Sequence, residues 1–530
     1  MKGFRIKRAF LVLPNGIWLI FHCCKWRCRV NEIQLQYVKN VIARQKGQLY
    51  QELTFFMLVK NYYPHKQCEV IWSDEEGNWS SLPAFYHSAI NQDEEYWHAH
   101  IAFITSIEKS IPGNIKFALR YQVQGKEYWD NNHGLNYSSQ ADSGVRLAPN
   151  YRLLNVGFEA NLCEGQKQVL INVAVNRVVN AKAVTIHWTI DNWQHTRTTE
   201  CVFNTNYWDR HLQSNARNPN QYGIQLWQGL LNIGNAFRLQ YSLCCHTDDQ
   251  VLWDNNYGSY YRACHSAFKV MILNLHCYQE DNQDSKFTQI AKAINEQNID
   301  VVCFQEVAEF WNDGHGDWDT NVAKIINDRL DRPYHLYTDW SHLGFDKYQE
   351  GVAILSKYPL LEQDSTYISS SQSIDNIHSR KVVMGQVDVP YFGLLNIYSA
   401  HLSWWEDGFF EQFERLNDWV IDKQTKNVKG SLLCGDFNIT PGSEGYNLVV
   451  KARHYEDQFL LANNHGAIQK IFKVNDPYWQ NKYSDDYRID YIFLIKKSQL
   501  EAVSGYVLFT DEDYGRVSDH CGYVVTFEPL

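Results

Sequence analysis

The sequence predicts a multidomain protein, with two β-sandwich modules in its first half and a layered α/β domain in its second half. Three observations support this fold class. A chain of 530 residues, at ~150 residues per domain, contains three or four domains. The stretch between residues 50 and 265 repeats itself in short alternating segments. From Phe268 onwards, apolar strand-like runs alternate with helical segments.

The composition is that of a folded, aromatic-rich protein. Hydrophobic residues make up 45% and charged residues 21%, which excludes a disordered tail. Aromatic residues reach 15%, with 18 Trp, 33 Tyr and 26 Phe, and this favours β-rich domains in which flat rings pack or line binding surfaces. The net charge of −11 argues against a chain that grips phosphate backbones, so nucleic acid is not an expected partner.

Residues 1–48 are set apart as a leader, which the sequence leaves open as a targeting signal, a disordered segment or part of the first module. Basic residues precede an apolar stretch from Ala9 to Cys23, which Pro14 and Gly16 interrupt. This stretch is too short to cross a bilayer, and no cleavage site follows it, so it resembles an incomplete signal peptide. No other window is long and apolar enough, and we expect no transmembrane segment.

The thirteen cysteines include no Cys-x-x-Cys pair, so a zinc ribbon is not expected. Several of them, such as Cys303 and Cys434, lie in apolar runs typical of core strands. Thiols used as small core residues fit a reducing compartment better than a disulfide framework. The expected location is therefore the cytoplasm, with secretion or export into a host cell as the alternative.

The repeat in the first half has two clear copies. Phe117–Tyr121 followed by Glu127–Tyr137 is matched by Phe237–Tyr241 followed by Val251–Tyr261. Every second residue of the short runs is apolar, which is typical of half-buried strands. A repeat of about 120 residues built from such strands is most simply a duplicated β-sandwich. The two modules are expected over residues 49–148 and 149–266.

Each copy carries the string Trp-Asp-Asn-Asn, at Trp129–Asn132 and Trp253–Asn256. An exposed indole stacks on a sugar ring, and Asn amides pair with adjacent hydroxyls. The alternative is that both Trp side chains are core residues and the Asn pairs form a turn, and the chemistry alone slightly favours this alternative.

The complete string, Phe-x-Leu-x-Tyr and then Tyr-Trp-Asp-Asn-Asn-x-Gly-x-Asn-Tyr, resembles the family 21 carbohydrate-binding modules that bind starch and glycogen. The first copy matches to its end, whereas Ser259–Tyr261 of the second copy departs from the pattern. The resemblance implies that the chain binds an α-glucan such as glycogen. The implied sugar-binding residues are Trp79, Trp129, Asn131, Asn132, Asn136, Tyr137, Trp193, Trp253, Asn255 and Asn256.

In residues 267–530, polar side chains follow the ends of apolar runs, where active sites of α/β domains usually lie. The run Phe268–Asn274 is expected to be a buried strand, followed by a helix near Phe287–Gln297 and a strand at Val301–Phe304. Taken singly, each polar residue suits a cap, a turn or a salt bridge. Six such sites in a fixed order are harder to explain that way. They are Asn274, Glu306, His401, Asp436 with Asn438, Asp490, and Asp519 with His520.

Together these sites resemble the endonuclease/exonuclease/phosphatase superfamily over residues 268–530. The motifs are Leu-Asn-Leu-His, Phe-Gln-Glu-Val, Ser-Ala-His-Leu, Gly-Asp-Phe-Asn, Arg-Ile-Asp-Tyr-Ile-Phe and Ser-Asp-His. The resemblance implies a four-layered α/β sandwich of the deoxyribonuclease I type, with two packed sheets between helices. It also implies hydrolysis of a phosphoester.

The resemblance implies a divalent cation, because an anionic phosphoester repels nucleophiles. Glu306 is the implied Mg²⁺ ligand, helped by Asn274, and Mn²⁺ is an expected substitute. Asp519 is expected to support the metal or the leaving group.

His520 is the implied general base, with Asp490 orienting it. In the alternative, Asp436 positions or deprotonates the water, and the sequence does not separate these roles. His401 and Asn438 are expected to donate to phosphate oxygens.

Two segments, Ser341–Ser356 and His401–Asp407, resemble the sugar-phosphate branch of the superfamily, which contains the maltose 6'-phosphate phosphatases. Within that branch, Arg380 or Lys381 is expected to grip the substrate phosphate. Trp404–Trp405 is either a platform for a sugar ring or core packing, with equal weight on both. Glu350 is expected to bind the substrate or to support a residue that does.

The sequence thus predicts a Mg²⁺-dependent phosphatase that acts on phosphorylated α-glucans or malto-oligosaccharide phosphates and is targeted by its carbohydrate-binding modules. The first alternative is a phosphodiesterase of the same fold, acting on sphingomyelin, a phosphoinositide or nucleic acid. The second alternative is a glycogen-binding scaffold without catalysis. The sequence does not determine the oligomeric state.

Overall fold

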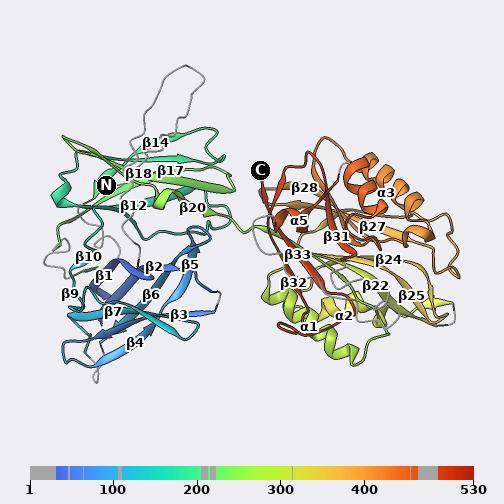
Figure 1. The fold of residues 1–530 in the computed structure, drawn as a ribbon, viewed down its shortest axis with the longest axis horizontal. Helices are drawn as coiled ribbons and strands as arrows, with labels where there is room; N and C mark the ends of the chain where they lie inside the picture. Colours follow the sequence, from blue (N-terminus) through green and yellow to red (C-terminus); the bar gives the residue numbers. More distant parts are fainter. Residues whose placement is uncertain are drawn as a thin grey trace, which may run out of the picture. The chain divides into compact units, whose positions relative to one another are not determined.

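The computed structural model describes residues 31–45, 48–63, 65–105, 110–204, 213–214, 222–312, 314–453, 455–463 and 488–530. The chain forms two compact units, Met1–Cys264 and His265–Leu530 (Figure 1). Most of the expected leader, residues 1–30, lies outside the described residues. No helix among the described residues is long and apolar enough to cross a membrane.

The first β-sandwich consists of two antiparallel sheets, in the strand orders β10-β1-β2-β6-β5 and β4-β3-β7-β8, with β9 beside β7 and the short β16 beside β1. Leu53, Phe55, Phe117 and Leu119 are fully buried between the sheets. The strands are β1 (Ile33–Gln45), β2 (Gln48–Lys60), β3 (Lys66–Ser73), β4 (Trp79–Pro83), β5 (Phe85–Ala89), β6 (Glu94–Ile104), β7 (Ile115–Val123), β8 (Lys126–Asp130), β9 (Tyr137–Ser139), β10 (Gly144–Leu147) and β16 (Gln213–Ser214).

Strand β1 shows that the first module begins earlier than residue 49. It pairs with β2 along its whole length and with β10 on its other side, and Leu35, Val38 and Val41 on it are buried. The described part of residues 1–48 is therefore a central strand of the sandwich. The available signal for this strand was the alternation of Ile33, Leu35 and Tyr37 with polar residues.

The second β-sandwich has sheets in the orders β11-β12-β17-β15 and β14-β13-β18-β19, with β20 beside β18. One buried cluster joins it to the first sandwich, since Phe56 and Tyr96 pack in the same core as Leu153 and Tyr261. The elements are β11 (Leu153–Val156), β12 (Gln168–Asn176), η1 (Arg177–Val179), β13 (Ala183–Thr189), β14 (Arg197–Glu200), β15 (Val202–Asn204), β17 (Ile224–Asn232), β18 (Arg238–His246), β19 (Val251–Asp254), η2 (Asn256–Gly258) and β20 (Tyr261–Cys264).

The repeat seen in the sequence has a physical basis in a buried hydrogen bond. Tyr137 donates its hydroxyl to Asp130 Oδ1 at 2.8 Å, and Tyr261 donates to Asp254 Oδ2 at 2.7 Å, seven residues apart in both copies. The Asp of each Trp-Asp-Asn-Asn string is thus an internal acceptor that fixes the strand that follows the string, β9 in the first sandwich and β20 in the second. The prediction of two duplicated β-sandwiches is confirmed.

The second unit is a four-layered α/β sandwich, as predicted. Its first sheet has the order β24-β25-β22-β21-β33-β32, with β23 beside β22, and its second has the order β26-β27-β28-β29-β31-β30. The strands are β21 (Phe268–Asn274), β22 (Val301–Asn312), β23 (His315–Gly316), β24 (His335–Gly344), β25 (Tyr348–Ser356), β26 (Leu360–Tyr367), β27 (Lys381–Val389), β28 (Gly393–His401), β29 (Val428–Asp436), β30 (Tyr455–Asp457), β31 (Asp490–Ile495), β32 (Leu500–Leu508) and β33 (Gly522–Pro529).

Helices cover the outer faces of the two sheets (Figure 1). In α1, Phe287, Ile290 and Ile294 recur at helical spacing and pack with α2 on the first sheet. In α3, Phe413 and Leu416 pack on the second sheet in the same way. The helices are α1 (Gln283–Glu296), η3 (Trp318–Thr320), α2 (Val322–Asp328), η4 (Trp405–Asp407), α3 (Phe409–Lys423), α4 (Glu444–Asn447), η5 (Leu448–Ala452) and α5 (Gln458–Ala462).

The two sheets approach each other closely at Gly435. A Cβ atom there would lie 2.0 Å from the carbonyl oxygen of Ala400 and 2.9 Å from Gln305 Nε2, and the backbone has a φ of +141°. Gln305 Nε2 donates to Ser399 Oγ at 3.1 Å and so links the first sheet to the second. Glycine is required at this point because a Cβ would clash with the backbone of the neighbouring strand β28 and with Gln305 of the other sheet.

Candidate functional site

Three polar residues lie side by side at one edge of the second sheet. β28 and β29 run parallel and pair His401 with Asp436, and β31 runs antiparallel and pairs Asp490 with Asp436. His401 Nε2 lies 3.7 Å from Asp436 Oδ2. Residues far apart in the sequence therefore meet because the carboxyl ends of parallel strands share one edge.

The first sheet contributes Asn274 and Glu306 to the same place. β21 and β22 run parallel and pair Asn274 with Gln305, and the pairing of β22 with β25 shifts at Glu306, whose φ is +50°. This bulge turns the Glu306 side chain out of the regular alternation. Asn274 Nδ2 donates to Glu306 Oε1 at 2.9 Å and to Asp436 Oδ2 at 3.1 Å, so one amide bridges the two sheets.

His520 and Asp490 form a buried pair beside Asp436. His520 Nδ1 lies 2.8 Å from Asp490 Oδ2, which leaves Nε2 facing Asp436 Oδ2 at 3.8 Å. Burial alone would lower the pKa of His520, but the charge and hydrogen bond of Asp490, with Asp436 and Asp519 nearby, raise that pKa well above its usual value. The imidazole of the free protein is therefore held as a cation.

The two buried carboxyl groups of the site hold their protons more tightly than usual. Burial, together with the neighbouring charge of Glu350, raises the pKa of Glu306 to about 7. Burial and the charge of Asp490 raise the pKa of Asp436 to about 7. Such a pair is ready to exchange protons for a cation, because a divalent ion stabilises the ionised forms.

His401 and Asn438 occupy the other side of Asp436. The Asn438 backbone N–H donates to Asp436 Oδ1 at 2.9 Å, and Asn438 Nδ2 donates to the Leu402 carbonyl at 2.8 Å and lies 3.3 Å from His401 Nε2. Burial, aided by the charge of Arg380, lowers the pKa of His401 well below its usual value. His401 is therefore a neutral imidazole, held by Asn438.

Of the two candidate phosphate-binding cations, Arg380 belongs to this site and Lys381 does not. Burial lowers the pKa of Arg380, and the charges of Glu350, Glu306 and Asp436 oppose that shift. Its Nη1 donates to a backbone carbonyl at 2.9 Å, whereas its buried Nε has no partner among the described residues. Lys381 opens β27 and pairs with Asp339 at 3.0 Å.

Glu350 lies next to Glu306 and is held by a histidine that the sequence analysis did not consider. His342 Nε2 is 3.4 Å from Glu350 Oε1, and the two residues pair across β24 and β25. Burial opposes ionisation, but His342 and the charge of Arg380 lower the pKa of Glu350. Glu350 is thus an ionised carboxylate between His342 and Arg380.

The two tryptophans after His401 differ in their surroundings. Trp405 packs against the buried core of the second unit, with ring centroids 6.0 Å from Phe409 and 6.4 Å from Phe410. Trp404 precedes η4 and is half-buried. Core packing therefore accounts for Trp405, and a role as a sugar platform is left to Trp404.

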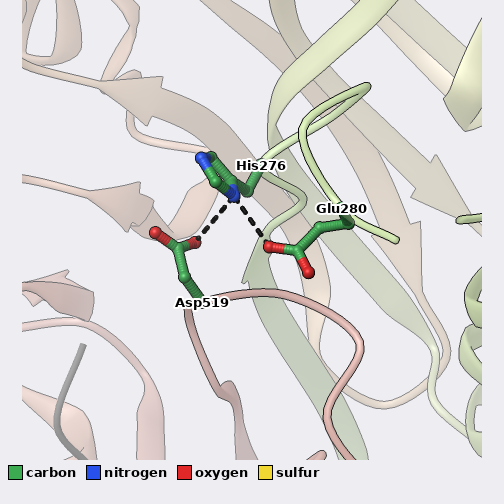
Figure 2. A group of neighbouring side chains, drawn as sticks. All are labelled: His276, Glu280 and Asp519. Atoms are coloured by element: carbon green, nitrogen blue, oxygen red, sulfur yellow. Dashed lines mark hydrogen bonds and ion pairs between the residues drawn. The ribbon is translucent and has the colours of Figure 1, made fainter. Parts of the chain in front are cut away.

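A second polar cluster adjoins the site and was missed by the sequence analysis. Figure 2 shows His276 between Glu280 and Asp519, with one ring nitrogen, Nδ1, facing both carboxylates at 2.7 and 3.6 Å. Lys286 donates to the other oxygen of Glu280 at 2.6 Å, and His276 and Lys286 lower the pKa of Glu280 to about 2 against the effect of burial. The available signal was the spacing of four residues between His276 and Glu280 in a loop that follows a strand.

The oxygen-rich half of the site fits a hard divalent cation. Glu306 and Asp519 provide carboxylate oxygens, and Asp436 lies across the site beside Asn274. Oxygen ligands of this kind suit Mg²⁺, which keeps several waters of its own. The Asn274 amide oxygen accepts the His276 backbone N–H at 3.0 Å, so Asn274 contacts both carboxylates through its nitrogen.

In the first sandwich, the expected sugar-binding residues divide into exposed aromatics and buried or turn residues. Trp79 is 51% and Trp129 43% exposed, and Trp129 also lies over the Arg120 guanidinium at 5.8 Å. Asn131 Oδ1 accepts the Gly134 N–H at 2.9 Å. The remaining residues have similar internal roles, since Asn132 donates to the Asn136 carbonyl at 3.1 Å and Tyr137 is buried on Asp130.

The second sandwich repeats this division. Trp253 is 55% exposed and lies 4.8 Å from the His187 ring, and Trp193 faces Tyr260 with centroids 4.4 Å apart. Asn255 Oδ1 accepts the Gly258 N–H at 3.0 Å. Asn256 is buried and accepts the Tyr96 hydroxyl at 2.6 Å. In both copies the Asn pairs make turn contacts, as the alternative expected, but Trp129 and Trp253 are exposed and are not the core residues that it also expected.

Comparisons with known families match both halves of the chain. Residues 271–520 match the Endonuclease/Exonuclease/phosphatase family, and residues 21–140 and 153–263 match the carbohydrate/starch-binding module of family 21. The second half is thus a phosphoester hydrolase domain of the deoxyribonuclease I-like class. The chain therefore carries two starch-binding modules ahead of an endonuclease/exonuclease/phosphatase domain, as the motifs indicated.

Similar individual proteins cover parts of the chain. Glucoamylase 1 of Rhizopus oryzae is 34% identical over 84 residues, which is 15% of this chain and 13% of that protein. An endonuclease/exonuclease/phosphatase family protein of Leptotrichia buccalis is 26% identical and covers 49% of this chain and 100% of its own, with a TM-score of 0.43. A mannosyl-6-phosphatase of Bacteroides thetaiotaomicron is 18% identical over 49% of this chain and 100% of its own, with a TM-score of 0.37.

Proposed function

We propose that this protein is a Mg²⁺-dependent phosphatase that removes phosphate from phosphorylated α-glucans or malto-oligosaccharides. The observation that carries the proposal is the meeting of Glu306, Asp436 and the Asp490–His520 pair, with Asn274 bridging the two carboxylates and the charge of Arg380 acting on both. Carboxylates for a cation and donors for an oxyanion are the two sets of groups that phosphoester hydrolysis needs.

Glu306 and Asp519 are the proposed cation ligands, and Asn274 orients Glu306 from the side. When bound, the divalent cation neutralises the negative charge of the phosphoryl oxygens. Mn²⁺ is expected to replace Mg²⁺, since it accepts the same oxygen donors. His276, fixed by Glu280, holds Asp519 in place from the other side.

Of the two possible general bases, Asp436 fits better than His520. A base that works near neutral pH needs a pKa near 7, and burial raises the pKa of Asp436 into that range. His520 is already protonated by its pairing with Asp490, so it is a donor rather than a base. In this proposal, Asp436 accepts the proton of the attacking water, while His520 Nε2 donates to a phosphate oxygen.

Arg380 and Asn438 complete the phosphate site. The buried Nε–H of Arg380 has no partner among the described residues, and a buried donor of this kind is costly unless an anion occupies it. Asn438 and neutral His401 lie on the far side of Asp436. Together with His520, these groups would surround the phosphoryl oxygens with donors.

The starch-binding modules are proposed to hold the glucan near the catalytic unit. The exposed Trp79, Trp129 and Trp253 rings and the Trp193–Tyr260 pair offer flat apolar faces to sugar rings. Weak contacts on two modules of one chain add up through effective concentration. This arrangement suits a polymeric substrate better than a single small sugar phosphate.

The proposal is tested by measuring phosphate release from maltose 6'-phosphate and from phosphorylated glycogen with Mg²⁺, using Asp436→Ala as the inactive control. We expect both substrates to be hydrolysed and DNA and sphingomyelin to be left intact. Cleavage of DNA or sphingomyelin, with no phosphate released from either glucan substrate, would overturn the substrate class and keep the reaction class.

A further inference from the structure

A basic pocket lies at the end of the second sheet opposite the candidate site. β29 begins at Val428, which lines the pocket, and ends at Asp436 in the candidate site. The pocket has a volume of about 310 Å³ and is formed by the α3–β29 connection and the β31–β32 turn. The lining side chains that matter here are Lys426, Lys429, Lys496, Lys497, Ser498 and Gln424.

No acidic side chain lines this pocket. None of its four lysines has an ion pair within the described part of the chain. By contrast, Lys423, the last residue of α3, pairs with Glu362 at 2.7 Å and with Asp364 at 2.8 Å. In a chain of net charge −11, four lysines around one cavity attract anions.

Lys497 also has an unfavourable backbone conformation. Its φ of +69° lies in the left-handed region, where glycine or asparagine is the less costly choice. The turn therefore carries a lysine side chain at a conformational cost, and such costs are frequently found at functional positions. The side chain of the next residue, Ser498, is fixed by donating to the Ile495 carbonyl at 2.5 Å.

Stabilisation of a helix end explains the position of only some of the pocket lysines. Lys426 follows α3 closely and can offset the negative end of that helix dipole. Lys496 and Lys497 lie on a turn between two strands, where no such dipole is present. The pocket thus gathers lysines from two separate connections.

We propose that this pocket is a second phosphate-binding site, which takes the phosphate group of a sugar phosphate independently of the catalytic centre. Its volume falls in the range of ligand pockets, and the lysine ammonium groups suit the phosphate of a phosphorylated sugar. The eight residue steps from Val428 to Asp436 span ~26 Å, so a small substrate cannot occupy both sites. The source would be free sugar phosphate or a further phosphate along a glucan, and the glucan source rests on the proposed function.

The test is isothermal titration of the full chain with glucose 6-phosphate, inorganic phosphate and glucose, in EDTA so that no divalent ion is bound. We expect glucose 6-phosphate to bind more tightly than glucose, with an affinity that falls as salt rises. The double variant Lys496→Gln/Lys497→Gln is expected to weaken binding at least about tenfold. The matched double variant Lys292→Gln/Lys451→Gln, with two exposed lysines of the same unit, is expected to bind normally.

Equal affinity of the two double variants, or no preference for glucose 6-phosphate over glucose, overturns the site. Inorganic phosphate binding as tightly as glucose 6-phosphate identifies a site for the phosphate group alone. Hydrolysis of maltose 6'-phosphate with Mg²⁺ is measured separately and is expected to be unchanged in Lys496→Gln/Lys497→Gln. If no variant or wild-type protein hydrolyses that substrate, the proposed function fails while the binding result still stands.

Discussion

Asp436 is the residue at which the two sheets and both histidines of the candidate site meet. Its Oδ2 atom lies 3.1 Å from Asn274 Nδ2, 3.7 Å from His401 Nε2 and 3.8 Å from His520 Nε2. A small group placed between these atoms would touch one acceptor and several donors. We propose Asp436 as the proton acceptor and His520 as a donor, two roles that the motifs alone left open.

Asp436→Asn is expected to lower kcat by about 10³-fold, because it removes the proton acceptor while keeping the side-chain shape. KM and the melting temperature are expected to change little. The measurement is steady-state phosphate release from maltose 6'-phosphate, with Asp388→Asn, an exposed carboxylate on β27, as the control. Retention of more than a tenth of the wild-type kcat would assign the base elsewhere.

Asp490→Asn tests the protonated state of His520. Asp490 holds the pKa of His520 well above its usual value, so the charge of His520 is lost only at high pH. Without the carboxylate, His520 loses its proton at lower pH, and the alkaline limb of kcat/KM is expected to move toward neutral pH. A pH–rate profile measures this shift, and an unmoved alkaline limb would show that activity does not depend on a protonated His520.

The raised carboxyl pKa values predict a link between pH, Mg²⁺ and stability. Because folding raises the pKa of Glu306 and Asp436 to about 7, the metal-free protein binds protons that the unfolded chain releases. Their contribution to the free energy of unfolding is present below pH ~4 and is lost as the pH rises through about 7.

Mg²⁺ is therefore expected to raise the melting temperature more at pH 8 than at pH 6, since protons compete with it at the lower pH. Thermal melts with and without Mg²⁺ at the two pH values measure the effect. The matched control is Glu306→Gln, in which the Mg²⁺-induced rise in melting temperature should differ less between pH 8 and pH 6. An equal effect of Mg²⁺ at both pH values in the wild type would contradict a cation site at these carboxylates.

At the scale of elements, the site depends on two departures from regular strands. The bulge at Glu306 turns its side chain toward the second sheet, and Gly435 lets the sheets come close enough for Asn274 to bridge them. Both features lie next to motif residues. They are geometric requirements rather than chemical ones, which explains why glycine precedes the aspartate in Gly-Asp-Phe-Asn.

Gly435→Ala is expected to destabilise the second unit by about 3 kcal/mol, because its Cβ would lie 2.0 Å from the Ala400 carbonyl oxygen. The control is Gly442→Ala, whose φ is also positive, at +83°, but whose Cβ would have nothing within 4 Å. Only a smaller loss, of about 1 kcal/mol, is expected there. Urea unfolding followed by tryptophan fluorescence measures both, and equal losses would show that the close backbone approach at Gly435 is not limiting.

At the scale of the whole molecule, the modules and the hydrolase domain are expected to contribute separately. Trp129→Ala and Trp253→Ala remove exposed rings, 43% and 55% accessible, and should weaken glycogen co-sedimentation several-fold through lost stacking. Hydrolysis of maltose 6'-phosphate should not change. The control is Trp318→Ala, which removes an exposed tryptophan of the second unit. Equal loss in the control, or no loss in either module variant, would contradict glucan binding at these rings.

The sequence predicted the order of domains and most of the candidate site because short motifs of neighbouring residues indicate both. Asp436 ends β29, Glu306 lies at the bulge of β22, and His520 precedes β33; the strand pairing brings these motif residues to one end of the sheets. Side-chain direction was harder to predict. Arg380 lies just before β27 and Lys381 begins it, and only the charge of Arg380 acts on the site, because Lys381 pairs with Asp339.

Contacts made in three dimensions were harder still to infer from the sequence. The Asn side chains of both Trp-Asp-Asn-Asn strings form hydrogen bonds within turns. Asn256 also accepts the hydroxyl of Tyr96, which belongs to the other sandwich. The pairing of His276 with Asp519 joins residues more than 200 positions apart. Neither could be inferred without the fold.

The most direct test of the central claim is phosphate release from maltose 6'-phosphate as Mg²⁺ is titrated into the EDTA-treated full chain, compared with Glu306→Gln. We expect no phosphate release without the cation and a rate that rises to saturation as Mg²⁺ is added. In Glu306→Gln this rate is expected to fall at least about 100-fold. Release that is equally fast in EDTA, or unaffected in Glu306→Gln, would contradict a cation-dependent phosphatase built on this cluster.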